Sequence, residues 1–179
     1  MRWEIDTTHS QVQFSVKHLG ISTVRGTFGR FAGMIDEENG AVTGATVEID
    51  VASLFSGNEQ RDGHLKGADF FDVETYPTAT FALKRFTRNG EDATAEGELT
   101  LRGITRPITL TGEIGGPATD PWGNKKVSAS LNGKISRKEW GLVWNVALEA
   151  GGLLVSDEVK LSIEVQAAPA ASAAIAVAA

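Results

Sequence analysis

The stretch from Asp6 to Asp36 constrains the fold more than any other part of the chain. Between positions 11 and 18, polar and apolar side chains alternate, with Val12, Phe14 and Val16 on one side. A period of two is typical of a β-strand that has one buried and one solvated face. The stretch therefore predicts a strand that covers an interior.

The alternation breaks in the second half of this stretch, between Phe28 and Phe31. Two aromatic side chains three residues apart cannot face the same side of a regular strand. We therefore predict a β-bulge at Gly29, which would bend the strand and bring both rings to one side. A bent strand is typical of a sheet that curls around an interior.

Composition narrows the class of protein. The chain has 179 residues, a net charge of −6 with scattered basic residues, and no cysteine. A nucleic-acid surface needs clustered Lys and Arg, and disulfides need cysteine, so neither is expected. No apolar run approaches the ~20 residues of a membrane-spanning helix. The N-terminus, MRWEIDTTHS, does not have the pattern of a secretory signal, so we expect a cytoplasmic protein, or a periplasmic one if the chain is a processed form.

Further alternating segments predict the rest of a sheet. Asn89-Gly90 is a strong two-residue hairpin signal, and both Glu37–Gly40 and Arg102-Gly103 predict turns. We expect one domain over residues 1–168, with the alanine-rich residues 169–179 as an unpacked tail or frayed helix. The predicted strands are Arg2–Asp6, at a sheet edge, then Ala41–Val51, Ala79–Leu83, Asp92–Leu101, Ile108–Ile114, Val127–Ile135 and Asp157–Gln166.

Two stretches lack a period of two. Ser53–Pro77 is rich in charge and predicts a crossover with a helical turn from Asn58 to Lys66 that ends at Gly67. Either Phe70 or Phe71 would attach it to the body of the fold, as a functional loop or as a plug over one end of the core. Ser136–Glu158 predicts a second short helical turn, Arg137–Trp140, with Trp140 and Trp144 packed inward.

About eight alternating strands joined by hairpin turns predict an all-β, antiparallel barrel or sandwich. Several inward positions hold small residues, which favours a barrel with room inside, because protein interiors are densely packed. Aromatic side chains from the opposite wall or a ligand would fill that room. The small inward residues are Ala93, Ala95, Gly97, Gly112, Ala129 and Gly133.

The sequence offers little for catalysis or metal binding. His9, His18 and His64 have no local metal-ligand spacing, so we expect no metal site. Adjacent side chains on an extended backbone point to opposite faces, so Ser10 and His9 would not converge with Asp6 as a catalytic triad. We expect no catalytic residue and no cofactor.

As a whole, residues 3 to 168 resemble the YceI-like polyisoprenoid-binding proteins. Each motif is weak alone, but together they occur in order and at family-like spacing. The matching residues are Asp6, His9, Ser10, Val12, Phe14, Val16, His18, Gly26, Phe28, Phe31, Gly33, His64–Lys66, Asp69–Asp72, Tyr76, Pro77, Ala79, Phe81, Gly97–Thr100, Arg102–Thr105, Ser136, Arg137, Trp140, Gly141 and Val155–Val159.

The resemblance implies an extended lipocalin-like barrel that holds a long isoprenoid chain, such as a polyprenyl pyrophosphate or a quinone tail. It also implies a homodimer and brings no catalytic residues, so we expect a non-enzymatic carrier or store. Two alternatives remain: a small-molecule hydrolase or isomerase in the same barrel, and a ligand-free structural or stress module. The residues predicted to line a lipid tunnel are Val12, Phe14, Val16, Phe28, Phe31, Phe70, Phe81, Leu83, Leu99, Leu110, Ala129, Leu131, Trp140 and Trp144.

A pyrophosphate or quinone head would lie at the mouth of such a tunnel and would need hydrogen-bond donors. His18, His64 and Arg137 are candidates, because they lie at a strand end or in the irregular stretches. Arg137 suits a phosphate best, since a guanidinium can donate two parallel hydrogen bonds.

Overall fold

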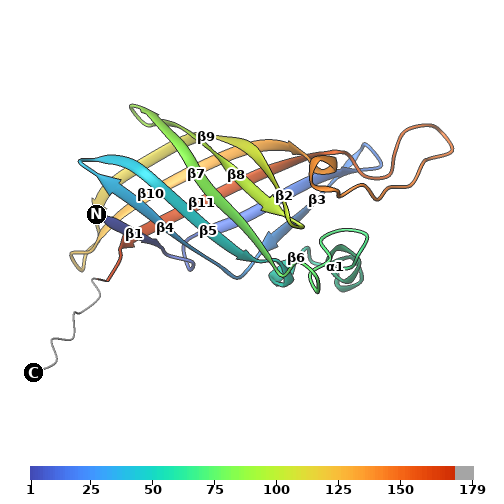
Figure 1. Cartoon of the computed structure of the whole chain (residues 1–179), viewed down its shortest axis with the longest axis horizontal. Helices are drawn as coiled ribbons and strands as arrows, with labels where there is room; N and C mark the ends of the chain where they lie inside the picture. The colour runs from blue at the N-terminus through green and yellow to red at the C-terminus, as the bar shows by residue number, and fades with distance from the viewer. Residues whose placement is uncertain (172–179) are drawn as a thin grey trace, which may run out of the picture.

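The computed structural model describes residues 1–171 and shows an elongated, closed antiparallel β-barrel with one short helix at one end (Figure 1). The predicted fold class is confirmed. The strands are β1 Arg2–Ile5, β2 Gln11–His18, β3 Ser22–Phe28, β4 Phe31–Glu38, β5 Ala41–Asp50, β6 Leu54–Phe55, β7 Thr78–Asn89, β8 Asp92–Leu101, β9 Ile104–Thr119, β10 Lys125–Ser136 and β11 Glu158–Pro169; the helices are the 3-10 turn η1 Val51–Ser53, α1 Glu59–Lys66 and the 3-10 turn η2 Arg137–Trp140.

The barrel closes with eight strand positions around its wall. Two of these positions are each formed by two shorter strands that follow one another along the barrel. β1 and β2 run in the same direction and both pair with β11, with Ile5 opposite Ala167 and Val12 opposite Ile163. β4 and β3 lie beside them in the same way, because β4 pairs with β1 and β3 pairs with β2. The remaining positions are β5, β7, β8, β9 and β10, each hydrogen-bonded to its neighbours.

β1 is not the edge strand that we predicted. It pairs with β4 on one side and with β11 on the other, and so closes the barrel. Trp3 and Ile5 point inward and are buried, 3% and 7% exposed. Sequence indicated that these two residues share a face, but the strand's two partners are set by the closure of the whole barrel.

The bulge predicted at Gly29 is instead a corner between two strands. β3 ends at Phe28 and β4 begins at Phe31, and the two residues between them contact Ser53. The amide of Gly29 donates to the Ser53 carbonyl at 3.2 Å, and that of Arg30 donates to the Ser53 hydroxyl at 3.0 Å. The chain therefore bends as expected, but by changing its pairing partners rather than by inserting a residue into one ladder.

Most predicted turns and helices are confirmed. Asn39-Gly40 and Arg102-Gly103 have left-handed backbones that suit tight hairpins. The Asn89-Gly90 hairpin is displaced by one residue, because Asn89 pairs with Asp92 and the turn is formed by Gly90 and Glu91. α1 begins after the Asn58 cap and ends before Gly67, and η2 spans the predicted residues 137–140.

The strand that ends the barrel runs slightly past the predicted domain boundary. Trp3 lies opposite Pro169, and the amide of Ala170 donates to the Arg2 carbonyl at 2.9 Å. The predicted unpacked tail or frayed helix falls mostly on residues 172–179, which lie outside the described part of the chain.

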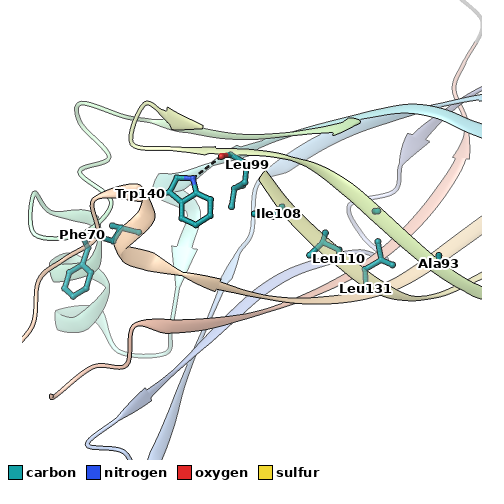
Figure 2. Packing of buried hydrophobic residues seen from close by; sticks show 9 residues of the cluster. Phe70, Ala93, Leu99, Ile108, Leu110, Leu131 and Trp140 are labelled. Carbon is teal, nitrogen blue, oxygen red and sulfur yellow. Dashed lines mark hydrogen bonds between the residues drawn. The ribbon is translucent and has the colours of Figure 1, made fainter. Parts of the chain in front are cut away.

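The apolar core follows the inner wall of the barrel. Its largest cluster runs from Phe70 and Trp140 near the helix to Leu131 and Ala93 farther along the strands (Figure 2). Alternation on β8 is regular, because Ala93, Ala95 and Leu99 are buried while the intervening residues are more exposed. The faces predicted to point inward therefore do so, and they enclose the candidate site.

Candidate functional site

Two cavities lie in series inside the barrel. The helix-side cavity, at the end that carries α1, has a volume of about 350 Å³ and is lined almost entirely by apolar side chains. The terminal-side cavity, at the end that carries the N-terminus, has a volume of about 610 Å³. Strands β7, β9 and β11 contribute apolar side chains to both cavities, so the two spaces share part of one apolar lining.

Four side chains line both cavities and therefore lie at the boundary between them, which we call the constriction: Val47, Phe81, Leu110 and Ile163. These residues come from β5, β7, β9 and β11, and thus from different sides of the barrel wall. All four are apolar. An elongated apolar molecule that passes this constriction would contact no polar side chain there.

The small inward residues are covered by large neighbours. The ring of Phe81 lies over Gly97, that of Phe14 lies over Gly26, and a methyl carbon of Leu110 lies 2.7 Å from where a Cβ at Gly133 would stand. Glycine at these positions lets side chains of adjacent strands lie close to the wall. Neighbouring side chains thus fill part of the room that we expected, and the two cavities are the part left open.

Twelve of the fourteen predicted lining residues face the cavities. Those on the helix-side cavity are Val12, Phe14, Val16, Phe28, Phe70, Phe81, Leu99, Leu110 and Trp144. Those on the terminal-side cavity are Leu83, Ala129 and Leu131, with Phe81 and Leu110 shared.

Phe31 and Trp140 line neither of these two cavities among residues 1–171. Phe31 packs instead on the cluster of Ile49, Val51 and Ala79, because the corner after Phe28 turns it away. Trp140 is fully buried, and its indole Nε1 donates to the Leu99 carbonyl at 3.0 Å (Figure 2). Both residues belong to the wall rather than to the lining.

Arg137 lies at the helix-side cavity, but its hydrogen bonds are made within the protein. Its Nη1 donates to the carbonyls of Leu142 and Trp144 at 2.6 and 2.9 Å, its Nε to Ser156 at 2.9 Å, and its Nη2 to Val155 at 3.4 Å. Burial lowers the pKa of the guanidinium, and Asp157 opposes that effect. The two parallel donors that we predicted for a phosphate are therefore committed, and Arg137 instead fixes residues 142–156 beside the cavity.

The other two predicted head-group residues also line the helix-side cavity. The imidazole of His18 makes no hydrogen bond among residues 1–171, whereas Nε2 of His64 lies 3.0 Å from Asp69 Oδ2. The His64 ring packs edge-on against Phe70 and Trp144, with centroid distances of 5.0 and 4.8 Å. His64 therefore helps to pack α1 onto the segment after η2 that contains Trp144, while His18 presents ring nitrogens that have no protein partner in the described chain.

Sequence reasoning missed Arg61, which lines the same cavity from α1. Its Nε and Nη2 donate to the hydroxyl and carbonyl of Ser56 at 2.8 and 2.6 Å, and its Nη1 makes no hydrogen bond within residues 1–171. The buried carboxylate of Asp62 accepts hydrogen bonds from the same serine and holds the helix start in place. The only sequence signal was an arginine three residues before His64 on one helix.

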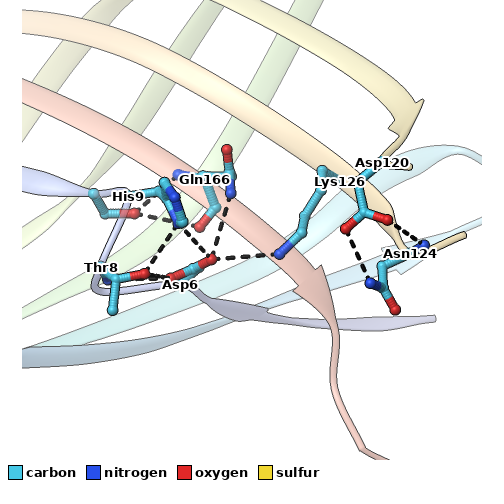
Figure 3. Close-up of polar contacts among 8 residues, drawn as sticks. Asp6, Thr8, His9, Asp120, Asn124, Lys126 and Gln166 are labelled. Atoms are coloured by element: carbon cyan, nitrogen blue, oxygen red, sulfur yellow. Dashed lines mark hydrogen bonds and ion pairs between the residues drawn. The ribbon is translucent and has the colours of Figure 1, made fainter. Parts of the chain in front are cut away.

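The motif Asp6–Ser10 holds the break between β1 and β2 (Figure 3). Asp6 accepts from Thr8 Oγ1 at 2.6 Å and contacts His9 Nδ1 at 2.9 Å and Lys126 Nζ at 3.3 Å. These contacts, led by Thr8 and His9, hold the pKa of the Asp6 carboxyl well below its ordinary value.

Ser10 does not join this network. It exchanges hydrogen bonds with the backbone of Gln166 on β11, accepting from its amide at 2.9 Å and donating to its carbonyl at 3.3 Å. The cluster therefore connects the broken strand to β11, and the Ser10 hydroxyl contacts Gln166 rather than His9.

Within residues 1–171, no group of three His, Cys, Asp or Glu side chains could hold a metal ion. No helix in that range is long and apolar enough to span a bilayer.

The model of the YceI-like domain matches residues 3–167, which is nearly the whole described barrel. The chain belongs to the YceI-like family. A relative, the UPF0312 protein of Enterobacter sp. strain 638, is 39% identical over 160 residues, which cover 88% of this chain and 80% of the relative. Protein YceI of Escherichia coli O157:H7 is 37% identical with coverages of 88% and 81%.

Solved structures of YceI-like barrels superpose well on this one. The YceI protein of Campylobacter jejuni is 35% identical, with a TM-score of 0.75 over 86% of this chain and 90% of that chain. A domain from Saccharophagus degradans has the same fold at 18% identity, with a TM-score of 0.67 over 93% and 97% of the two chains.

Proposed function

We propose that this YceI-like protein binds one long isoprenoid lipid along the axis of its barrel and carries or stores it without chemical change. The observation that carries the proposal is the pair of apolar cavities that meet at Val47, Phe81, Leu110 and Ile163. A compact ligand would need one cavity, whereas a flexible, branched hydrocarbon chain can occupy both and pass the constriction.

The physical driving force is large for such a ligand. Each buried methylene contributes ~0.8 kcal/mol, so a chain of several isoprene units gains much more than the cost of being ordered. The barrel from Saccharophagus degradans, which shares the fold, is described as a polyisoprenoid-binding domain. That description supports the chemical class of the ligand proposed here.

The head group lies at the helix-side end in this proposal. His18 and Arg61 supply donors that are unused within residues 1–171, and His64 stands beside them. A pyrophosphate or quinone oxygen can accept hydrogen bonds from these groups while the chain extends toward the terminal-side cavity. Arg137 contributes positive charge near the same end and no free pair of donors.

Native mass spectrometry of purified protein, followed by organic extraction, tests the proposal. We expect one co-purifying prenyl lipid per barrel, or stoichiometric uptake of added polyprenyl pyrophosphate or ubiquinone by stripped protein. The same spectra report whether the homodimer that we include in the proposal forms. Protein that is empty and also takes up no prenyl lipid would overturn the proposal, and an extracted lipid that is chemically altered on incubation would favour an enzyme.

A further inference from the structure

Two loop tips at the helix-side end expose a group of large apolar side chains. One tip connects β2 to β3 at residues 19–21, and the other is the long loop of residues 143–155; together we name them the platform. Ile21 is 84% exposed, the same fraction as Trp122 at the opposite end of the barrel. The exposed apolar residues of the platform are Leu19, Ile21, Val143, Val146 and Leu153.

The platform has a defined backbone. The amide of Leu19 donates to the Leu154 carbonyl at 2.9 Å, and the amide of Leu154 donates to the Val146 carbonyl at 2.9 Å. The side chain of Asn145 both accepts from the Val155 amide, at 3.0 Å, and donates to its carbonyl, at 2.6 Å. The two tips therefore form one surface, whose apolar side chains are held outward by hydrogen bonds below them.

The platform lies beside the opening of the helix-side cavity. His18, Leu154 and Val155 line that cavity and also connect the two tips, since His18 pairs with Val155. Figure 1 shows the long loop extending farthest beyond the end of the barrel, while the tip between β2 and β3 and the helix α1 reach less far. A flat surface that meets this end would therefore touch the long loop first.

A row of basic side chains lies behind the platform although the chain carries a net charge of −6; acidic exceptions are Glu149 in the long loop and Glu158 at the start of β11. Ser15 lies opposite Arg25 and Lys160, and Lys160 lies opposite Lys134, so a basic row crosses the outer faces of β3, β2, β11 and β10. Lys17 is exposed on the same face of β2. Within residues 1–171 only Lys134 of this row forms an ion pair, at 3.9 Å from Glu158.

Apolar tips backed by a basic row have the chemistry of a protein that inserts side chains into the interface of an anionic bilayer. A second copy of the chain fits less well, because a two-fold contact through the platforms would bring two basic rows toward each other. The segment formed by α1 and the residues after it is acidic at its surface, with Glu59, Asp69, Asp72 and Glu74 against Arg61 and Lys66.

We propose that the platform docks on the surface of a bilayer that contains anionic lipids, with the opening of the helix-side cavity beside the membrane. Ile21, Val143 and Leu153 enter the interface, and Lys17, Arg25 and Lys160 lie near the head groups. The proposal concerns the outer surface, so it can fail or hold independently of what the barrel contains.

The absence of cysteine gives a direct test. Ile21→Cys, labelled with an environment-sensitive fluorophore, is mixed with vesicles of phosphatidylcholine that contain about one third phosphatidylglycerol. We expect a blue shift and increased intensity on these vesicles, and little response on pure phosphatidylcholine. The matched control is Trp122→Cys with the same label, whose equally exposed side chain lies on a loop fixed by Asp120 (Figure 3). This control should show no shift.

Unlabelled variants measure the energetics by vesicle co-sedimentation. Ile21→Ser with Leu153→Ser should reduce binding to the anionic vesicles at least about tenfold, and Trp122→Ser should leave it unchanged. Lys160→Glu should weaken binding, and about 0.5 M salt should do the same. Thermal melts test whether each variant is folded. If the double variant Ile21→Ser with Leu153→Ser does not fold, the single variant Val143→Ser is used in its place.

Three results would overturn the proposal. The first is that wild-type protein does not bind the anionic vesicles. The second is that Trp122→Ser lowers binding as much as the platform variants do. The third is that the platform variants convert a dimer to a monomer in solution without any vesicle binding by the wild type, which would make the platform an interface between copies.

Discussion

The ring of Phe81 lies against the Cα of Gly97 on the neighbouring strand, in the space that a Cβ at position 97 would need. The carbonyl of Ala82 would stand 2.6 Å from the same Cβ. The absence of a side chain on β8 therefore lets an aromatic ring of β7 lie near the wall, and this ring is one of the four side chains that line both cavities.

Gly97→Ala should push Phe81 inward and narrow the constriction. We expect a loss of about 1–3 kcal/mol in the free energy of unfolding from overpacking, and a shift of bound lipid toward shorter chains. Urea denaturation and mass spectrometry of extracted lipid measure the two effects. Gly63→Ala is the control, because a Cβ there meets nothing within 4 Å in α1, so it should raise stability by about 0.5–1 kcal/mol. Unchanged lipid length in a stable Gly97→Ala protein would contradict the role of Phe81.

Substitutions of Trp140 and Trp144 should affect different properties, stability in the first case and lipid binding in the second. Trp140→Phe removes the indole hydrogen bond to Leu99 and should cost about 1–2 kcal/mol of unfolding free energy, with little change in lipid affinity. Trp144→Ala removes a side chain that lines the cavity and should weaken binding of a prenyl lipid. The opposite pattern in a titration of stripped protein would show that the wall and the lining have been assigned the wrong way round.

Arg137→Ala should release the long loop, because four backbone carbonyls lose their donor. We expect a loss of at least about 2 kcal/mol in unfolding free energy, and faster proteolytic cleavage within residues 142–156. Arg137→Lys should rescue little, since an ammonium group cannot reproduce the planar set of donors. As a control, Arg85→Ala removes a solvent-exposed pair with Glu96 and should leave stability almost unchanged.

His18 and Arg61 should recognise the lipid head rather than the chain. The double change His18→Phe with Arg61→Ala should lower affinity for a polyprenyl pyrophosphate by about tenfold or more, because charge-assisted hydrogen bonds are lost. Affinity for the corresponding head-free hydrocarbon should stay the same. Competition between the two ligands, monitored by native mass spectrometry, measures this selectivity, and an equal loss for both would place the head elsewhere.

The carboxylate of Asp6 should make the free energy of unfolding depend on pH in the acid range. Its pKa is lowered on folding, so its contribution is complete well above the unfolded value of about 3.9 and is lost as pH falls toward the folded value. Asp6→Asn should cost about 1–2 kcal/mol near neutral pH, and the difference from wild type should shrink below about pH 4. Urea denaturation at several pH values tests this, and a difference that grows in acid would contradict the assignment.

The strands were predictable because each has one face toward the interior. On β8, β10 and β11 the alternation of residues 93–101, 127–135 and 159–165 matches the inward faces found in the structure. The lining of the cavities follows from the same pattern, and the resemblance to the YceI-like family added the barrel and its ligand class. Local sequence contains this information because side-chain direction alternates along any strand.

The remaining features depend on contacts between distant segments. Trp140 is apolar like the residues that line the cavities, but it is fully buried in the wall, where its indole donates to the Leu99 carbonyl. Arg137 has the chemistry of a phosphate ligand, but its donors reach carbonyls 5 to 19 residues away. Neither partner can be deduced from spacing, because both depend on where the long loop folds back.

The closure of the barrel by β1 has a consequence for folding during synthesis. Within the barrel, Trp3 belongs to the first strand to be synthesised, and its partner Pro169 belongs to the last. Until β11 has been made, β1 pairs only with β4 and is an edge strand with unpaired backbone groups, which must be kept from pairing with other strands. The final seam between β1 and β11 therefore cannot form before the last strand of the barrel has been translated.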